Sequence, residues 1–193
     1  MRFLERIRDY IRISRVASIS RRYFIMNAFD GAMTSLGIVV GAYVAGAPEP
    51  FFIISAGLGA SLAMGLSGFV GAYVTEEAER TRELDSLERA MLQNLEQSVI
   101  GKASRFASVW TGAVDGLSPA LSSILCLVPF FFSSLLSVEL AIQLSIVIAL
   151  FILFLLGAFL GKVSSRNMLL HGTKLLCVGL ALTFLLLVFR TIY

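Results

Sequence analysis

The sequence predicts an all-α membrane protein with five transmembrane helices. Three observations support this fold class: 57% of the 193 residues are hydrophobic and only 15% are charged, the mean hydropathy is +0.84, and five apolar runs each reach the roughly 20 residues that a helix needs to cross ~30 Å of hydrocarbon. A water-soluble domain carries about a quarter charged residues. We therefore expect neither a soluble enzyme nor a free nucleic-acid-binding protein.

The five predicted spans occupy residues 24–45, 51–75, 106–132, 138–160 and 168–189. Residues 144–156 are apolar on every side, whereas the strands of a membrane β-barrel alternate between apolar and polar residues. Residues 1–22 are rich in charge and lack an apolar signal core, so we expect no secretory signal before span one. The predicted organisation is a basic amphipathic N-terminal helix (1–22), spans one and two (23–75), an acidic cytoplasmic helical segment (76–105) and spans three to five (106–193).

The basic residues predict the orientation of the chain. Fifteen of the 16 lysines and arginines lie before span one, between spans two and three, or between spans four and five, and only Arg190 lies on the other side. Because cytoplasmic loops are enriched in Lys and Arg, we expect a cytoplasmic N-terminus and an outside or lumenal C-terminus. The N-terminal arginines lie opposite an apolar stripe with Phe3, Ile7 and Tyr10, which suits a helix on the anionic lipid of the inner leaflet.

Two aspartates lie inside the predicted spans, Asp30 and Asp115. Each lies roughly 10–15 Å along its helix from the cytoplasmic end, at a rise of 1.5 Å per residue. The run Ala28-Phe29-Asp30-Gly31 resembles Ala113-Val114-Asp115-Gly116, which indicates a parallel internal repeat unless the few identities arose by chance. Because a charge in hydrocarbon is costly, each aspartate is a candidate residue of a transport pathway.

Methionines accompany Asp30 on one face of span one. Met26, Asp30 and Met33 follow each other at i, i+4 and i+7, with Asn27 beside them. A carboxylate with thioether sulfurs suits borderline ions such as Fe²⁺ better than Mg²⁺ or Ca²⁺. The alternative is that the methionines fill packing gaps and that Asp30 is hydrogen-bonded inside the bundle.

Small residues line span two at four-residue spacing, and Met64 interrupts them. Together with Gly37 and Gly41 of span one, these residues predict close packing of the two spans, or of two subunits. Met64 then points into a helix interface or a pathway, although gap filling explains it equally simply. The small residues of span two are Ala56, Gly57, Ala60, Ser61, Gly65, Gly68 and Ala72.

An acidic segment follows span two. Between residues 76 and 96, seven acidic residues accompany three arginines, and no Gly or Pro occurs before Gly101, so span two should continue into the cytoplasm as a helix. One interpretation is a solvated helix with Glu79–Arg82 and Asp85–Arg89 pairs. The other is a carboxylate cluster that gathers divalent cations at the mouth of a pathway. The candidate metal ligands are Glu76, Glu79 and Glu83 on one face, and Asp85, Glu88 and Glu96 in a second set.

The run NAFDGAMTSLGIVVG from Asn27 to Gly41 resembles the first span of the vacuolar iron transporter family, an Asp-Gly pair followed by a glycine-spaced helix. MGLSGF at 64–69 resembles the second-span motif of that family. Ser118-Pro119-Ala120, followed by Val128-Pro129, resembles its third-span motif. The resemblance covers nearly the whole chain, although plant members carry a glutamate where Gly68 stands and have a longer glutamate-rich domain.

This resemblance implies a homodimeric exporter that moves Fe²⁺, often also Mn²⁺, out of the cytosol in exchange for protons. It further implies that Asp30 and Met64 line the pathway and that the acidic segment gathers metal. Two other functions stay open: a proton-coupled transporter of another cation or small metabolite, and a non-transporting membrane scaffold. We expect no enzyme, because the lone His171 has no nucleophile or metal-ligand group nearby in the sequence, and no permanently bound cofactor.

Overall fold

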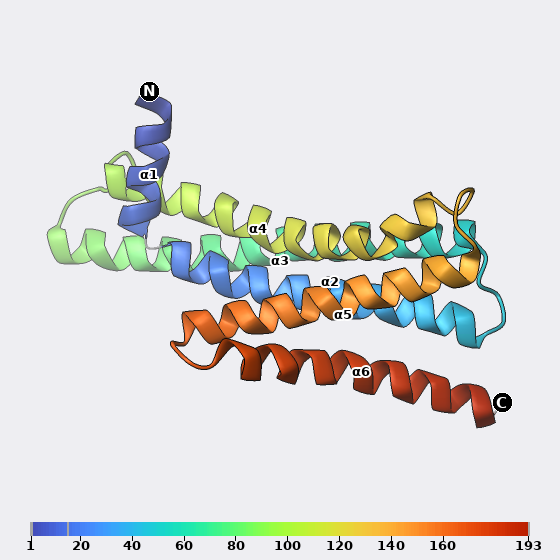
Figure 1. Ribbon diagram of the computed structural model, residues 1–193. Helices are drawn as coiled ribbons and strands as arrows, with labels where there is room; N and C mark the ends of the chain where they lie inside the picture. Colours follow the sequence, from blue (N-terminus) through green and yellow to red (C-terminus); the bar gives the residue numbers. More distant parts are fainter. Residues whose placement is uncertain (1, 15, 193) are drawn as a thin grey trace. The chain divides into compact units, whose positions relative to one another are not determined.

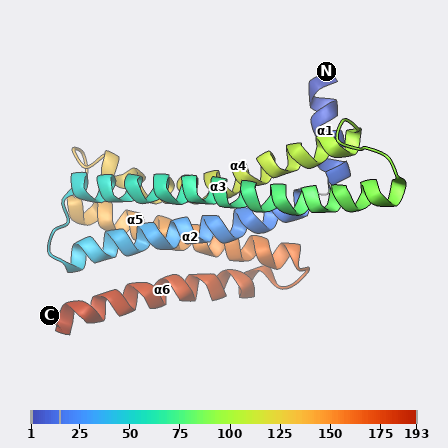
Figure 2. The same cartoon turned by 180° about the vertical axis from the view of Figure 1, so that it is seen from behind.

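Six α-helices make up the structure. The computed structural model describes residues 2–14 and 16–192, and this part of the chain contains no β-strand. Figure 1 and, from behind, Figure 2 show the helices. They are α1 (Arg2–Ser14), α2 (Val16–Val44), α3 (Pro50–Met91), α4 (Val99–Phe131), α5 (Val138–Val163) and α6 (Met168–Ile192).

Five of these helices, α2 to α6, are long and apolar enough to cross a membrane, counted over the described residues. The predicted fold class is therefore confirmed, with one helix on each predicted span. The basic N-terminal region divides differently from the prediction, because only residues 2–14 form a separate helix and residues 16–22 belong to α2. The side chains of Phe3 and Arg190 lie outside the described part of the chain.

The chain forms two compact units. The first comprises Met1–Phe24 and Gly65–Leu117, and the second comprises Ile25–Met64 and Ser118–Tyr193. The long helices α3 and α4 each contribute one part to each unit.

An apolar core joins α2, α3, α4 and α5 in the second unit. Val39, Ile53, Leu127 and Phe130 are fully buried in one cluster. A second cluster of buried side chains continues along α2 and α5 and includes Cys126 of α4. Such burial of large apolar side chains on several helices fixes how these helices pack.

The helices α5 and α6 form an antiparallel hairpin in the second unit, side by side in both views (Figure 1, Figure 2). Glycines allow this close approach: a Cβ at Gly161 would lie 2.8 Å from the Cα of Met168, and one at Gly172 would lie 2.6 Å from the Phe154 ring. The α5 and α6 backbones therefore lie closer together than they could if these glycines carried side chains.

Three serines from three helices form a buried hydroxyl cluster in the second unit. The Ser35 and Ser123 Oγ atoms lie 2.6 Å apart, and Ser61 Oγ donates to Ser123 Oγ over 2.7 Å. Ser61 Oγ also reaches the Gly57 carbonyl oxygen at 2.7 Å. Because all three hydroxyls are paired, the cluster ties α2, α3 and α4 together without leaving a polar group unsatisfied.

In the first unit, α1 contacts the start of α4 through aromatic rings. The Tyr10 and Phe106 ring centroids are 5.7 Å apart, and Phe106 stacks on Trp110 at 5.8 Å. The predicted amphipathic N-terminal helix thus forms, and part of its apolar stripe packs on α4. Its predicted contact with the lipid surface stays a prediction.

The helix α3 continues beyond its apolar run, as the sequence predicts, but it ends at Met91, well before Gly101. Leu92 adopts a left-handed backbone with φ of 49°, and the Gln93 N–H donates to the Glu88 carbonyl oxygen over 3.3 Å. This is the geometry of a helix C-terminus with a left-handed residue after the last turn. A leucine is rare at such a position, and no glycine marks the end of this helix in the sequence.

Candidate functional site

Asp30 lies in the middle of α2, in the second unit. Its side chain is exposed in the isolated chain, and none of the hydrogen bonds or ion pairs among the described residues involves its carboxylate. The alternative interpretation, a hydrogen bond of Asp30 inside the bundle, is therefore wrong for this chain on its own. A carboxylate at membrane depth then needs water, a cation, a proton or another subunit.

Gly31 determines which way Asp30 points. A Cβ on Gly31 would lie 2.8 Å from the Cα and the carbonyl carbon of Pro119, so the α2 and α4 backbones touch there. Because successive helical residues are about 100° apart, a glycine turned toward α4 turns Asp30 away from it. Ser122 Oγ holds the same crossing by donating to the Ala28 carbonyl oxygen over 2.7 Å.

Met64 of α3 lies beside the Asp30 side of α2. Thr34 Oγ1, one helical turn after Asp30, lies 3.6 Å from Met64 Sδ in a hydrogen bond. Both side chains are half-buried. The structure thus brings a thioether from α3 to within one turn of the carboxylate, as the pathway hypothesis requires.

The other predicted pathway residues of α2 differ in their surroundings. Met26 is 56% exposed, one turn before Asp30. Met33 packs against the buried cluster of α2, α4 and α5, so packing accounts for part of its role. Asn27 is half-buried. The carboxylate and Met26 therefore form the open part of the site, and Met33 forms its edge.

The Asp30 side of α2 continues as an uncovered face. A Cβ added at Gly37 or Gly41 would meet nothing within 4 Å. We call this surface the open α2 face and define it by Met26, Asp30, Gly37 and Gly41. The predicted packing of these glycines against the small residues of α3 does not occur within the chain.

The small residues of α3 instead pack against α4. A Cβ at Gly57 would meet the Leu127 side chain in the second unit, and one at Gly116 of α4 would lie 2.5 Å from the Gly65 carbonyl oxygen in the first. Sequence spacing shows that a face can approach a neighbour closely, but not which neighbour it selects. The small residues of α3 thus allow close packing, but against α4 within the chain, and the alternative of packing between two subunits stays a prediction.

Asp115 lies on α4 in the first unit and is only 6% exposed. A Cβ at Gly68 would lie 2.8 Å from the Asp115 Oδ2 atom, so the carboxylate occupies the space that a side chain at position 68 would take. Asp30 and Asp115 thus occupy different environments, one exposed and one enclosed. Each Asp-Gly pair lies at a close helix crossing, and the internal repeat itself stays a prediction.

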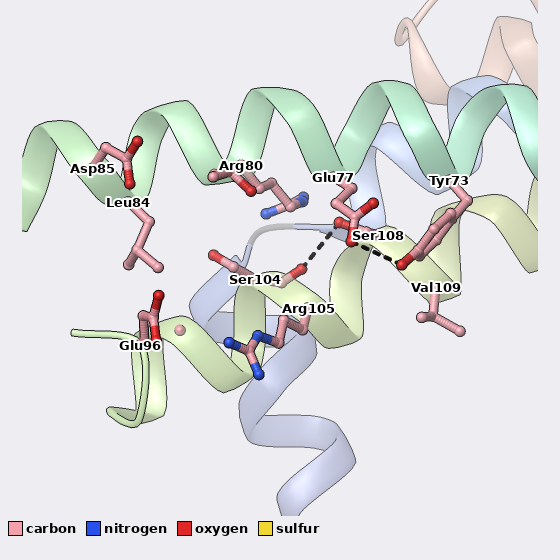
Figure 3. A pocket seen from close by; sticks show the side chains of 12 residues that line it. Tyr73, Glu77, Arg80, Leu84, Asp85, Glu96, Ser104, Arg105, Ser108 and Val109 are labelled. Atoms are coloured by element: carbon pink, nitrogen blue, oxygen red, sulfur yellow. Dashed lines mark hydrogen bonds between the residues drawn. The ribbon is translucent and has the colours of Figure 1, made fainter. Parts of the chain in front are cut away.

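The acidic part of α3 lines two cavities in the first unit. One, of about 390 Å³, has Glu76, Glu79, Glu83 and Arg80 in its wall. The other, of about 440 Å³, lies between α3 and α4, and Figure 3 shows Glu77, Asp85, Glu96 and Arg105 around it. The prediction that Glu76, Glu79 and Glu83 share one face is confirmed.

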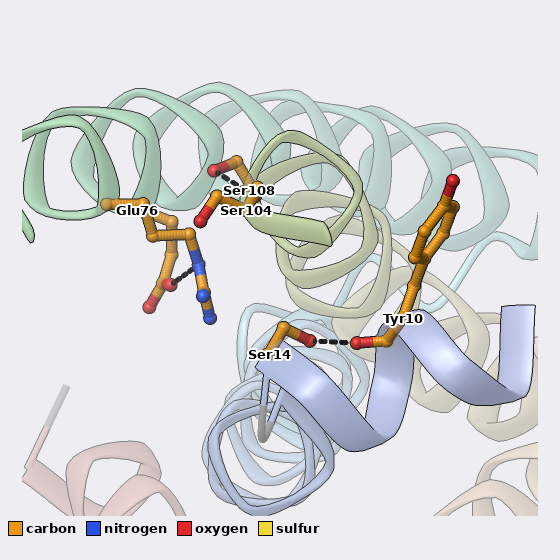
Figure 4. Close-up of polar contacts among 6 residues, drawn as sticks. Tyr10, Ser14, Glu76, Ser104 and Ser108 are labelled. Atoms are coloured by element: carbon orange, nitrogen blue, oxygen red, sulfur yellow. Dashed lines mark hydrogen bonds and ion pairs between the residues drawn. The ribbon is translucent and has the colours of Figure 1, made fainter. Parts of the chain in front are cut away.

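Arg80 neutralises part of this acidic surface. Arg80 is 8% exposed and its Nε lies 3.0 Å from Glu76 Oε2; Figure 4 draws this ion pair beside Ser104 and Ser108. It is the one ion pair found among the described side chains, so the predicted Glu79–Arg82 and Asp85–Arg89 pairs are wrong. Glu76 is thereby less available to a metal ion than Glu79 or Glu83.

The remaining predicted ligands, Asp85, Glu88 and Glu96, do not form one group. Glu88 Oε1 accepts the Leu95 N–H over 2.6 Å, which holds the turn after α3. Asp85 and Glu96 line the larger cavity. Over the described part of the chain, no three His, Cys, Asp or Glu side chains form a group that could hold a metal ion. Metal binding by this segment therefore stays a prediction that needs water or a second subunit to complete the ligands.

Comparison with known proteins places the chain in a family. It is 36% identical over 167 residues to "Uncharacterized protein MJ0645" of Methanocaldococcus jannaschii, which covers 85% of each chain. The chain belongs to the family of this archaeal protein. No family model matches the chain, and no solved structure matches it. The name of this family member states no activity, so the function of the family has to be argued from the site.

Two features of the structure were not predicted from the sequence. The buried serine cluster was missed because single serines in apolar spans carry no spacing signal. The Arg80–Glu76 pair was missed because Arg80 has three acidic residues at i±3 and i±4, and only burial selects one of them.

Proposed function

We propose that the protein exports divalent metal ions, Fe²⁺ and Mn²⁺, from the cytosol in exchange for protons. The observation that carries this proposal is Asp30, a carboxylate in the middle of a membrane-crossing helix with no partner among the described residues. An ionisable group in a membrane helix almost always faces a bundle interior or an aqueous pathway. A structural aspartate would instead be expected to hydrogen-bond within the chain.

A free carboxylate can carry either of two cargoes in turn. When deprotonated it offers anionic oxygens to a metal ion, and when protonated it carries no charge and holds a proton. These two states exclude each other, so one residue can exchange a metal ion for a proton. An amide at the same position could do neither.

The thioethers near Asp30 support a borderline metal over a hard one. Met64 is held at α2 by Thr34, and Met26 is exposed one turn from the carboxylate. Soft sulfur ligands favour transition metals, whereas Mg²⁺ and Ca²⁺ take oxygen ligands. This combination of ligands agrees with the resemblance to the vacuolar iron transporter family.

A second copy of the chain completes the proposed site. Divalent ions commonly take about six ligands, more than one Asp30 and the nearby thioethers supply. The open α2 face has small residues at Gly37 and Gly41 with free space above them, which permits two helices to approach closely in lipid. A homodimer joined along this face would bring two Asp30 carboxylates into one pathway between the subunits.

The acidic part of α3 would collect the ions before transport. Carboxylates gathered at a cavity raise the local concentration of cations. Glu79 and Glu83 line such a cavity without an ion-pair partner among the described side chains, whereas Glu76 pairs with Arg80. We assign this collecting role to Glu79 and Glu83 first.

Ion flux into proteoliposomes with an imposed pH gradient tests the proposal. Fe²⁺, Mn²⁺ and Co²⁺ are expected to move and to drive proton counterflow, whereas Mg²⁺ and Ca²⁺ are expected to move poorly. Met64→Leu should weaken the preference for Fe²⁺ over Mg²⁺, and Met91→Leu, at an exposed methionine at the end of α3, is the matched control. Proton-coupled flux of another solute without metal would favour the second transporter hypothesis, and no flux of any solute would favour a scaffold.

A further inference from the structure

The helix α4 has its polar side inward and its apolar side outward. A stripe of hydroxyl and carboxyl side chains follows one face, at positions i, i+4, i+7, i+11, i+14 and i+18. The opposite face exposes large apolar side chains, among them Trp110, Leu117 and Leu121. We call the first face the α4 polar stripe. It consists of Ser104, Ser108, Thr111, Asp115, Ser118 and Ser122, all buried except for the half-buried Ser104.

Thr111 is the unusual member of this stripe. Its side chain is 0% exposed, and its Oγ1 atom makes no hydrogen bond with any described residue. By contrast, Ser108 Oγ donates to the Ser104 carbonyl oxygen over 3.3 Å, and Ser122 Oγ to that of Ala28 over 2.7 Å. An enclosed hydroxyl without a partner is costly, and a threonine in a helix can usually avoid this cost by bonding back to its own helix. Thr111 therefore needs a partner from outside the chain, such as a water molecule.

Thr111 occupies the position between an open cavity and a buried carboxylate. It follows Ser108 by three residues and precedes Asp115 by four, which is roughly 4.5 and 6 Å along the helix axis. Ser104 and Ser108 line the cavity of about 440 Å³ between α3 and α4, where Figure 3 shows both serines facing α3. The Asp115 carboxylate lies against Gly68. One hydroxyl and one water molecule can span each of these steps.

We infer that the α4 polar stripe conducts protons between the cavity and Asp115, with Thr111 as the relay. A hydronium ion in the cavity gives a proton to the Thr111 oxygen and is left as neutral water, while Thr111 releases its own hydroxyl proton to the Asp115 carboxylate, which becomes a neutral carboxyl group. The net result is one proton moved, with Thr111 unchanged. This inference rests on the proposed proton-coupled function and adds that Asp115, in addition to Asp30, carries protons.

The charged groups around this route are of both signs. Glu77, Arg80 and Asp85 of α3 line the cavity. Glu96, in the turn before α4, and Arg105 of α4 line it from the other side. At Asp115, the side facing α3 meets Gly68. From this charged cavity the route passes only uncharged hydroxyls before it reaches the Asp115 carboxylate.

Infrared spectroscopy of the full-length protein in lipid vesicles tests the relay without any metal. The carboxyl band that disappears in Asp115→Asn is followed after a pH jump in D₂O. Thr111→Val removes the hydroxyl at similar volume and should slow the response of this band roughly 100-fold, the lower end of what a positioned proton-transfer group contributes. Thr111→Ser keeps the hydroxyl and should respond at the wild-type rate, as should Thr75→Val, the same substitution at an exposed threonine of α3.

Three results would overturn the inference: a wild-type response in Thr111→Val, an equal slowing in Thr111→Ser, or a pH-difference spectrum that Asp115→Asn leaves unchanged. The spectroscopic readout also separates this inference from the proposed function. A slowed band together with absent metal transport would retain the relay and refute the metal exporter. Metal transport together with an unaffected band would do the reverse.

Discussion

Gly31→Ala tests the helix crossing that orients Asp30. The new Cβ would lie 2.8 Å from the Cα and the carbonyl carbon of Pro119, whereas carbon atoms in contact are normally about 3.5–4.0 Å apart. The α2 and α4 backbones would have to separate by roughly 0.7 Å or more to reach this distance. Backbone atoms cannot rotate away as a flexible side chain can, so the whole crossing must shift.

The expected change in the free energy of unfolding follows from two opposing effects. Overpacking of this kind costs about 1–3 kcal/mol, and the strained crossing also carries the Ser122–Ala28 hydrogen bond. Alanine recovers about 1 kcal/mol relative to glycine in a helix interior. With about 1 kcal/mol more for the weakened Ser122–Ala28 hydrogen bond, we expect a net loss of about 2 kcal/mol, which lowers the Tm by roughly 4–8 °C for a chain of this size. Gly59→Ala is the matched control, because its Cβ would meet nothing within 4 Å, and it should stabilise the protein by about 0.5–1 kcal/mol.

The two native cysteines provide the assay. Cys126 is fully buried in the second unit and Cys177 is exposed. In a Cys177→Ser background, a thiol-reactive fluorophore added during heating reports unfolding through Cys126 alone. If Gly31→Ala melted at or above the temperature of Gly59→Ala, the backbones of α2 and α4 would not meet at Gly31, and the orientation of Asp30 would need another explanation.

Three further predictions concern the packing, the orientation and the acidic segment. Ser123→Ala removes the shared partner of the serine cluster and should cost about 1 kcal/mol in the same unfolding assay; an unchanged Tm would mean that the cluster does not join the helices. In a cysteine-free background, a cysteine at Ala47 should react with an impermeant thiol reagent from outside and one at Ser86 only after the membrane is opened, and the opposite pattern would invert the predicted orientation. Glu79→Gln with Glu83→Gln should raise the metal concentration for half-maximal transport roughly two- to fivefold at unchanged maximal rate; unchanged binding and transport would reduce the segment to a solvated helix.

The sequence predicts the fold class well because the membrane imposes it. A helix in hydrocarbon has to satisfy its own backbone, so apolar length alone identifies all five crossing helices. Their ends follow different rules. Arg21 and Arg22 lie before the apolar run but belong to α2. The helix α3 ends at Met91, and the left-handed residue that follows it is Leu92 instead of a glycine.

The site is less predictable because it depends on which helix faces touch. Periodicity places Asp30 and Met26 on one face, and the structure agrees. It cannot reveal that Gly68 makes room for Asp115, or that Arg80 selects Glu76 among several acidic neighbours. Both features depend on distances between different helices, which cannot be predicted from the spacing of residues within one helix.

Metal-driven proton movement in Asp30→Asn proteoliposomes tests the central claim most directly. Vesicles containing a pH-sensitive dye receive Fe²⁺ or Mn²⁺, and metal entry and proton exit are recorded together for wild type, Asp30→Asn and Asp9→Asn, the same change at an exposed residue of α1. Because an amide can neither bind the ion as an anion nor carry the proton, Asp30→Asn should abolish both movements while the protein remains folded and inserted. Asp9→Asn should behave as wild type. Coupled transport at the wild-type rate by Asp30→Asn would contradict the assignment of Asp30 as the group that exchanges metal for protons.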